Sequence, residues 1–318
     1  IGAQVIATPG CESNVKEIFD KTNELKQDPQ YMIFNQFEEM GNPLWHYNVT
    51  GNALADVFEA IKRPGDRFAG ACFTSGSAGT MSTGDRLKEL YPKLKLGVGE
   101  ALQCPTILEN GFGGHRIEGI GDKHIPWIHN VKNTDMVIDI DDEDSQRLLR
   151  LFNTPEGRTY LKEELHLSDE LLEQLTWLGI SGIANVLCCI KMAKYYELTE
   201  RDVVGTVLTD SAVMYGSRIQ ELNELHGAYT VREAAMDHAI HMLGLKTDSM
   251  MELTYRDRKR IHNLKYYTWV EQQGKTAEEL DALWYDTEGT WDAVHAQAKD
   301  LDVLIDALNE ETGVLKTL

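Results

Sequence analysis

One segment constrains the fold most, because in it an apolar run, a turn of small residues and a helical pattern follow one another. The apolar run covers residues 68–73, the turn is Thr74-Ser75-Gly76-Ser77-Ala78-Gly79-Thr80, and the helical pattern covers residues 81–91. The glycines allow a tight turn and a close approach of a ligand to the backbone. Unpaired N–H groups and the positive end of a helix dipole favour a phosphate there, and the Ser77 and Thr80 hydroxyls add donors. The same small residues also occur where a strand simply turns into a helix, so both interpretations stay open.

Short apolar runs alternate with helix-length amphipathic stretches through about residue 227. This alternation predicts an α/β fold. Several of the runs are continuously apolar, as expected for parallel strands that are covered on both faces, so we expect a mostly parallel twisted sheet covered by helices. The predicted strands are residues 3–8, 31–35, 68–73, 94–98, 136–140 and 203–208.

A long helical stretch lies between the last two predicted strands. Its apolar residues recur at helical spacing, and Lys191 and Lys194 lie off that face, which predicts a core helix. The stretch is preceded by Gly179-Ile180-Ser181-Gly182, whose small residues allow close approach of another group. The apolar positions are Ile183, Val186, Leu187, Ile190 and Ala193.

Beyond residue 228 the strand signals stop, and the sequence predicts helices to the end of the chain. One apolar stripe there is too short for a stable coiled coil by itself, so we expect it to dock on the core or on a partner subunit. His238 and His241 share a predicted helix face, but no third ligand is evident, and no metal is expected. The stripe consists of Val294, Ala298, Leu301, Ile305 and Leu308.

Charge and composition exclude several classes of partner. The formal net charge is −20, whereas binding to a nucleic-acid backbone needs clustered Lys and Arg, so no nucleic acid is expected. No apolar run reaches membrane-spanning length and no signal peptide is visible, which predicts a cytoplasmic protein without a membrane partner. The five cysteines form no metal or disulfide pattern and are expected to be reduced: Cys11, Cys72, Cys104, Cys188 and Cys189.

Four further segments accompany the small-residue turn in a fixed order. Together with the turn they resemble the fold-type II pyridoxal-phosphate enzymes of the cysteine synthase and tryptophan synthase beta-like family, in particular its longer cysteine-synthase-like branch. The similarity runs from residue 1 to about residue 218. The four segments are Asn35-Gln36-Phe37 with Gly41-Asn42-Pro43 and Thr50-Gly51, then His115-Arg116-Ile117-Glu118-Gly119-Ile120-Gly121, then Gly179-Ile180-Ser181, and finally Leu208-Thr209-Asp210-Ser211.

The resemblance implies a role for each matched position. Ser211 would face the pyridine nitrogen of the cofactor, and a neutral hydroxyl there favours β-elimination and β-replacement over transamination. Ala78 stands where the family usually has glycine, and we expect it to adopt an ordinary negative φ. The implied binders of pyridoxal 5′-phosphate are Gly76, Ser77, Ala78, Gly79, Thr80, Gly179 and Ser211, and the implied substrate-binding residues are Gln36, Gly119 and Gly121.

The Schiff-base lysine of the family has no counterpart in this sequence. In the family it lies upstream, so a preceding segment is missing, another polypeptide supplies it, or the chain is catalytically inactive. The resemblance therefore implies part of a pyridoxal-phosphate-dependent lyase or transferase, with β-elimination or β-replacement of an amino acid as its reaction and a homodimer as its assembly. The expected division is a remnant of the small domain (1–40), the large cofactor-binding domain (41–227) and a helical extension (228–318). An ammonia-lyase, the pyridoxal-phosphate subunit of an amino-acid thiolase and a non-catalytic assembly subunit are the alternatives.

Overall fold

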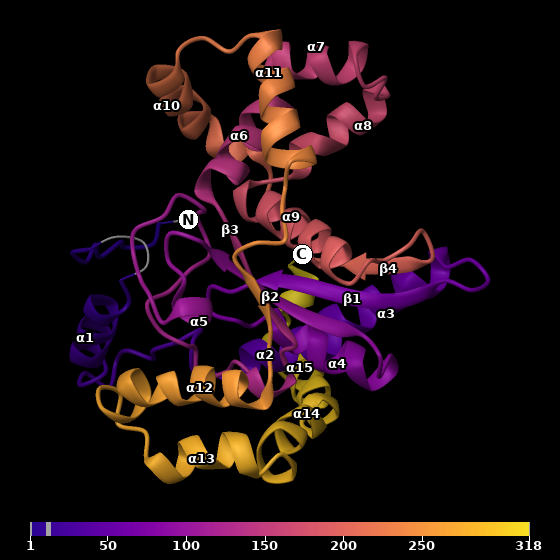
Figure 1. The fold of residues 1–318 in the computed structure, drawn as a ribbon. Helices are drawn as coiled ribbons and strands as arrows, with labels where there is room; N and C mark the ends of the chain where they lie inside the picture. The colour runs from indigo at the N-terminus through magenta and orange to yellow at the C-terminus, as the bar shows by residue number, and fades with distance from the viewer. Residues whose placement is uncertain (1, 11–13, 318) are drawn as a thin grey trace.

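A five-stranded sheet forms the centre of the computed structural model, which describes residues 2–10 and 14–317. The strand order is β4-β1-β2-β3-β5, and the first four strands in this order run parallel. Helices cover the sheet, which confirms the predicted fold class (Figure 1). The strands are β1 (Arg67–Thr74), β2 (Lys95–Ala101), β3 (Met136–Ile140), β4 (Asp202–Gly205) and β5 (Met250–Glu252).

The helices lie before, between and after the strands. They are α1 (Lys16–Leu25), α2 (Gly41–Trp45), α3 (Gly51–Ile61), α4 (Met81–Leu90), α5 (Thr106–Glu109), α6 (Asp142–Asn153), α7 (Pro155–Glu163), α8 (Asp169–Gln174), α9 (Ile180–Tyr195), α10 (Gly216–His226), α11 (Val231–Asp237), α12 (Tyr255–Lys265), α13 (Ala277–Tyr285), α14 (Ala293–Ala296) and α15 (Ala298–Thr312). Single 3-10 or π-helical turns cover His46–Thr50, Val131–Asn133, Leu175–Trp177, Ala212–Tyr215, His238–Leu243, Tyr266–Val270, Glu288–Asp292 and Val314–Lys316.

Local sequence explains where several helices begin. Asp141 and Thr154 accept hydrogen bonds from backbone N–H groups of the first turns of α6 and α7, and Pro155 is the first residue of α7. Thr254 and Thr276 each form a capping box at the start of α12 and α13. A cap of this kind stabilises a helix by about 1 kcal/mol, so these starts are encoded next to the helices themselves.

Two apolar clusters bury the two faces of the sheet. On one face Ile138 of β3 packs in a cluster with Leu149 of α6 and Ile183 of α9. On the other face Val98 of β2 belongs to a cluster with Leu87 of α4. Full burial of one such side chain contributes roughly 2 kcal/mol. Because both faces are covered, the strands can be continuously apolar, as the sequence indicated.

Two predicted strands are wrong, and a third is too long. Residues 3–8 and 31–35 adopt no regular secondary structure, and they expose Val5 (87%) and Phe34 (83%). An apolar run becomes a strand only beside another strand, and these segments lie next to none. Residues 206–208 leave β4, because Thr206 donates its hydroxyl to the carbonyl of Cys72 and Val207 accepts a bond from the Asn185 side chain.

The prediction of an all-helical C-terminal extension is also wrong, because β5 lies within it. Residues 250–252 pair antiparallel with β3, with Met250 opposite Ile138 and Glu252 opposite Met136. A three-residue strand gives too short a pattern to be recognised in a sequence. The division of the chain into three parts remains a prediction.

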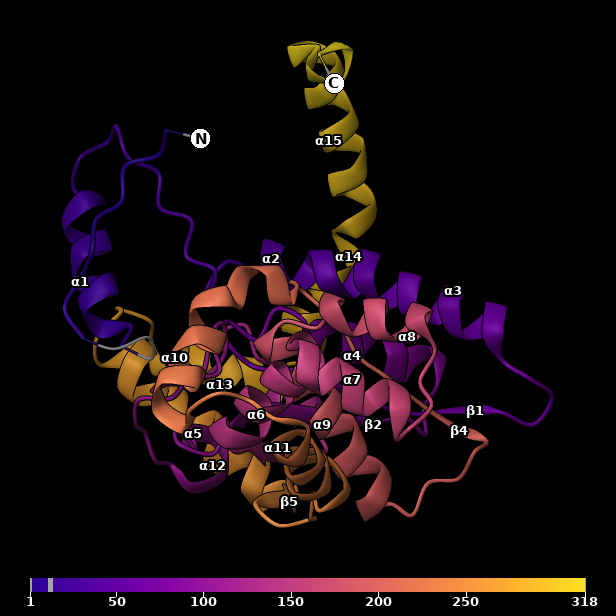
Figure 2. The same cartoon turned by 90° about the horizontal axis from the view of Figure 1, so that it is seen from above.

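Helix α15 projects away from the rest of the chain (Figure 2). None of its described residues is buried, and Leu304 and Leu308 are 62% and 58% exposed. The His295 ring of α14 stacks on Tyr47 at 3.7 Å between ring centres, which fixes the base of the projection. The apolar stripe therefore does not dock on the core, which was one of the two expectations for it.

In the described residues, no single helix is both long enough and apolar enough to cross a membrane. The segment 169–177 and helix α9 meet this criterion only when they are taken together, and the chain bends by 109° between them. Cys72, Cys104 and Cys188 are buried free thiols and Cys189 is a half-buried one. Cys11 lies outside the described residues.

Candidate functional site

A cavity of about 590 Å³ lies where β1 and β4 end. Ligands bind at this edge of open α/β sheets because the loops that follow the strands meet there. The lining residues are Val15, Ile18, Phe19, Thr22, residues 33–37, His46, Phe73, Thr74, residues 76–80 and 119–122, Ser181, Asn185, Val207 and Thr209. The small-residue turn therefore faces the cavity along nearly its whole length.

The turn between β1 and α4 presents a row of unpaired N–H groups. In α4 the N–H groups of Met81, Ser82 and Thr83 bond to carbonyls three residues earlier. The N–H groups of residues 76–80 donate to no group in the part of the chain that the structure describes. Unpaired N–H groups before a helix are able to donate to a ligand, and here they lie at the positive end of the α4 dipole. We call residues 76–80 the N–H cup, and its geometry suits a phosphate.

Both glycines of the cup are required by close contacts. A Cβ atom on Gly76 would lie 2.8 Å from the carbonyl oxygen of Gly119, and one on Gly79 would lie 2.1 Å from Oδ1 of Asn42. The Asn42 amide donates to the Gln36 carbonyl (2.8 Å) and to Oγ of Ser77 (3.3 Å). Asn42 thus fixes the segment that carries Gln36 against the cup.

The expectation for the backbone of Ala78 is wrong. Ala78 has φ of +66°, the left-handed conformation that glycine adopts without cost and alanine does not. The side chain is 2% exposed and packs among the residues that cover one face of the sheet. Burial of the methyl group offsets part of the backbone strain, which explains how alanine is accommodated.

A second loop, residues 115–122, forms the opposite wall. Gly119 and Gly121 adopt φ of +84° and +77°, and the N–H of Gly121 donates to the Ser75 carbonyl (2.8 Å). This bond joins the loop directly to the residue before the cup. Gly119 and Gly121 both line the cavity, as does Gln36.

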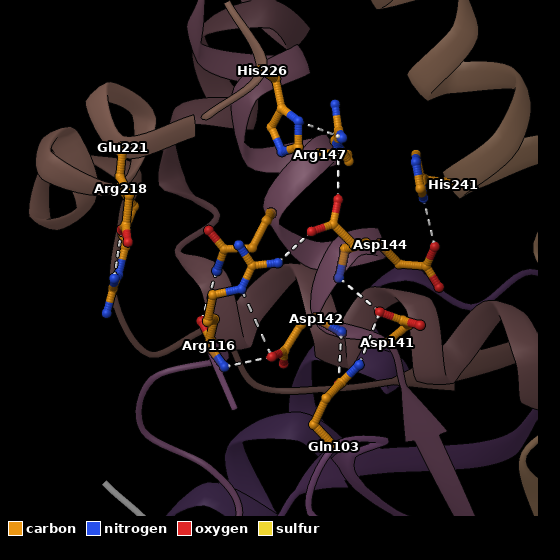
Figure 3. Close-up of polar contacts among 12 residues, drawn as sticks. Gln103, Arg116, Asp141, Asp142, Asp144, Arg147, Arg218, Glu221, His226 and His241 are labelled. Carbon is orange, nitrogen blue, oxygen red and sulfur yellow. Dashed lines mark hydrogen bonds and ion pairs between the residues drawn. The ribbon is translucent and has the colours of Figure 1, made fainter. Parts of the chain in front are cut away.

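A polar network holds this loop on the N-terminal end of α6 (Figure 3). The N–H of Arg116 donates to Asp142 (2.7 Å), and its carbonyl accepts a bond from Gln146 (2.6 Å). The guanidinium of Arg116 pairs with Glu143, which also binds Arg147 (2.9 Å). Arg147 in turn contacts His226 of α10. The network therefore couples the wall of the cavity to the helices that follow β4.

Two polar side chains on the buried face of α9 form the floor of the cavity. Asn185 accepts a hydrogen bond from the N–H of Thr74 (2.8 Å) and donates to the Val207 carbonyl (2.9 Å). One turn earlier, Ser181 bonds to Thr209 (3.2 Å). Sequence reasoning did not identify Asn185. Its signal was a polar residue four positions after Ser181 on an otherwise apolar helix face.

Gly179 and Ser211 do not belong to the residues that line the cavity. The N–H of Gly179 donates to the Asp210 carbonyl (3.1 Å), and a Cβ atom on Gly179 would lie 1.8 Å from Oδ1 of Asp210. Ser211 is half-buried and precedes a 3-10 helix, and Thr209 is the residue of this segment that reaches the cavity. The roles of Gly179 and Ser211 remain predictions.

No lysine lines the cavity in the described part of the chain. Lys191 was expected to lie off the apolar face of α9, but it is 3% exposed, and it donates to the Asp139 carbonyl (2.9 Å). Lys265 is fully buried, donates to the carbonyls of Trp127 (2.7 Å) and His129 (2.8 Å), and has a pKa lowered to about 7 by burial. Neither lysine reaches the cavity. The described residues contain no group of three His, Cys, Asp or Glu side chains that could hold a metal ion.

Comparisons with known proteins agree with this geometry. No family model matches the chain. A probable cysteine synthase of Bacillus subtilis is 34% identical over 158 residues, which are 49% of this chain and 50% of the relative. The cysteine synthase of Staphylococcus aureus is 30% identical over 215 residues, 67% of this chain and 61% of the relative. The chain is a homologue of the cysteine synthases.

This cysteine synthase homologue spans about half to three fifths of the length of these two curated relatives. The crystal structure of the O-acetylserine dependent cystathionine beta-synthase from Helicobacter pylori superposes with a TM-score of 0.52 at 27% identity. That superposition covers 68% of this chain and 62% of that one. The fold-type II resemblance drawn from the five segments is therefore confirmed as homology and as fold.

Proposed function

We propose that the N–H cup binds the phosphate of pyridoxal 5′-phosphate, and that the homologue is part of an enzyme of amino-acid β-elimination or β-replacement. The observation that carries the proposal is the row of five N–H groups, from Gly76 to Thr80, which find no partner within the described chain and face a cavity at the end of β1. A phosphate supplies the acceptors that these groups lack, and the hydroxyls of Ser77 and Thr80 add two donors.

The other residues that line the cavity would position the cofactor and the substrate. When bound, the cofactor supplies an electron sink for the bonds at the α-carbon of an amino acid. Gln36 lies on the segment that Asn42 fixes against the cup, where it would hold the substrate carboxylate. Gly119 and Gly121 leave two positions of the opposite wall without a side chain. Ser181 and Asn185 would orient polar groups of the ligand from the floor.

The described residues that line the cavity include no lysine, so they offer no amine that could take the place of the Schiff-base lysine. Shuttling of a proton at the α-carbon needs an amine held close to it. We therefore propose that this chain alone binds the cofactor through its phosphate but does not turn over amino acids. The cysteine synthase relatives do not favour the ammonia-lyase or thiolase alternatives. A non-catalytic assembly subunit would share the cup, but it would stay inactive even when the segment that carries the lysine in the family is supplied.

The proposal is tested by comparing pyridoxal phosphate with pyridoxal, which lacks the phosphate. Equilibrium dialysis should show saturable binding of pyridoxal phosphate that inorganic phosphate displaces, and at least tenfold weaker binding of pyridoxal. Borohydride reduction and peptide mapping should find no stoichiometric adduct on one lysine. Equal binding of both aldehydes would refute the cup. A stoichiometric adduct with steady turnover would show that the active site lies elsewhere.

A further inference from the structure

Asp122 is the one carboxylate among the described residues that line the cavity. It directly follows Gly121, whose N–H bonds to Ser75, and Ser75 directly precedes the cup. Since consecutive Cα atoms lie about 3.8 Å apart, Asp122 is within roughly 12 Å of the Cα of Gly76. Asp122 and the N–H cup therefore line the same small cavity.

The side chain of Asp122 makes no structural contact that explains its presence. Oδ2 is buried and has no hydrogen-bond partner in the described part of the chain. The neighbouring Lys123 does not neutralise it, because its Nζ donates to Asn14 and lies 5.5 Å from the ring centre of Phe112. It is the backbone carbonyl of Asp122, not its carboxylate, that accepts a bond from Thr106 (2.7 Å).

The surroundings make an unpaired carboxylate costly. Phe19, Phe37 and Ile120 line the same cavity, and the described lining contains no Lys or Arg. Burial raises the pKa of Asp122 to about 7, because a charge without a counter-charge is poorly solvated there. A cation that enters the cavity would restore the lost interactions, and charge-assisted hydrogen bonds of this kind are the strong ones.

We propose that Asp122 is an ammonium subsite, so that the cavity selects ligands that carry an ammonium group within reach of the phosphate held by the N–H cup. The inference deepens the proposed function and rests on its phosphate site. In an amino-acid enzyme it predicts a preference for a substrate or nucleophile with a positively charged amine beyond the reacting centre.

The test uses pairs of ligands that differ only in charge at one end. O-phosphoethanolamine is compared with propyl phosphate, 3-aminopropyl phosphate with butyl phosphate, and 4-aminobutyl phosphate with pentyl phosphate, by calorimetry at pH 8 with the full chain. At the chain length that fits the cavity best, the aminoalkyl phosphate should bind about tenfold more tightly than the alkyl phosphate paired with it. In Asp122→Asn the preference should vanish while the alkyl phosphate keeps its affinity, and Asp122→Glu should retain part of the preference.

The outcomes separate the two proposals. Binding of alkyl phosphates without an ammonium preference at any length, or a preference that survives in Asp122→Asn, would overturn the ammonium subsite alone. No binding of either member of any pair would overturn the N–H cup and the subsite together. The Asn variant is isosteric and removes an unpaired buried charge, so its unfolding midpoint in urea at pH 8 should equal or exceed that of the wild type.

Discussion

Replacement of Gly79 by alanine tests whether the cup is held by the contact with Asn42. Gly79 has no positive φ, so alanine fits the backbone there, and any cost must come from the added methyl group. That group would lie 2.1 Å from Oδ1 of Asn42 and 2.8 Å from its Cγ. Both distances are shorter than any tolerated contact, so the amide of Asn42 has to move.

The expected magnitude follows from the bonds that Asn42 would lose. It donates to the Gln36 carbonyl at 2.8 Å and to Oγ of Ser77 at 3.3 Å. A hydrogen bond of this kind contributes about 1 kcal/mol net, so Gly79→Ala should lower the free energy of unfolding by about 1–2 kcal/mol. It should also weaken phosphate binding at least several-fold, because the segment that carries Gln36 is released from the cup.

A double-mutant cycle in urea separates this mechanism from a general intolerance of change. In an Asn42→Ala background the obstacle is gone, and Gly79→Ala should cost less than about 0.5 kcal/mol. Gly182→Ala in α9 is the matched control, since its nearest neighbour would be Leu208 at an ordinary 3.5 Å. It should be neutral or stabilising by up to about 1 kcal/mol, because alanine favours a helix over glycine. An equal cost of Gly79→Ala in both backgrounds would refute the reasoning.

Three further predictions concern the backbone of the cup, a buried amine and the projecting helix. Ala78→Gly should change stability by less than about 1 kcal/mol, because relief of the left-handed strain offsets the lost methyl group, whereas Ala78→Val should cost about 2 kcal/mol or more in urea unfolding; similar costs for both would contradict the strain. The folded-state pKa of Lys265 is about 7, below its ordinary 10.5, so the unfolded state binds the proton more tightly. Stability should therefore rise with pH between about 7 and 10, by up to about 1.4 kcal/mol per pH unit relative to Lys265→Met, and parallel pH profiles would exclude this. If the expected homodimer forms through α15, the double change Leu304→Asp and Leu308→Asp should halve the mass in light scattering without lowering the unfolding midpoint, and an unchanged mass would place the interface elsewhere.

Much of the core could be predicted from the sequence, because its signals are local and redundant. The continuous apolar run of β1, the glycines of the turn and the amphipathic helix after it each indicate the same structure, and residues 76–80 line the cavity accordingly. The segments 33–37 and 119–121 reach the cavity from distant parts of the chain. Only their resemblance to a known order of motifs predicted that, since spacing alone does not state which loops meet.

The wrong predictions and the overlooked residues have physical causes of a different kind. Residues 3–8 and 31–35 have the composition of strands, but tertiary context decides whether a strand finds a neighbour. The backbone of Ala78 was misjudged because burial of a methyl group, which the sequence does not display, makes a strained φ tolerable. Asn185 was missed because one polar residue among the apolar residues of a helix is a weak signal. Asp122 was missed because a charged residue in a loop, followed by Lys123 and His124, is ordinary in a sequence. The importance of each appears only when its surroundings are known.

The strand β5 has a consequence for how the chain folds as it is synthesised. It covers the outer edge of β3 with a short antiparallel ladder, and the N–H of Leu253 and the carbonyl of Asp135 extend it with a bond of 2.7 Å. Synthesis proceeds from the N-terminus, so the four parallel strands leave the ribosome before residues 250–252 exist. Until then β3 presents a free edge that can pair with another nascent chain. The last third of the chain therefore covers this edge of the sheet only after the other strands have been synthesised. A polypeptide that stops before residue 250 would be released with the edge of β3 unpaired and able to pair with another copy.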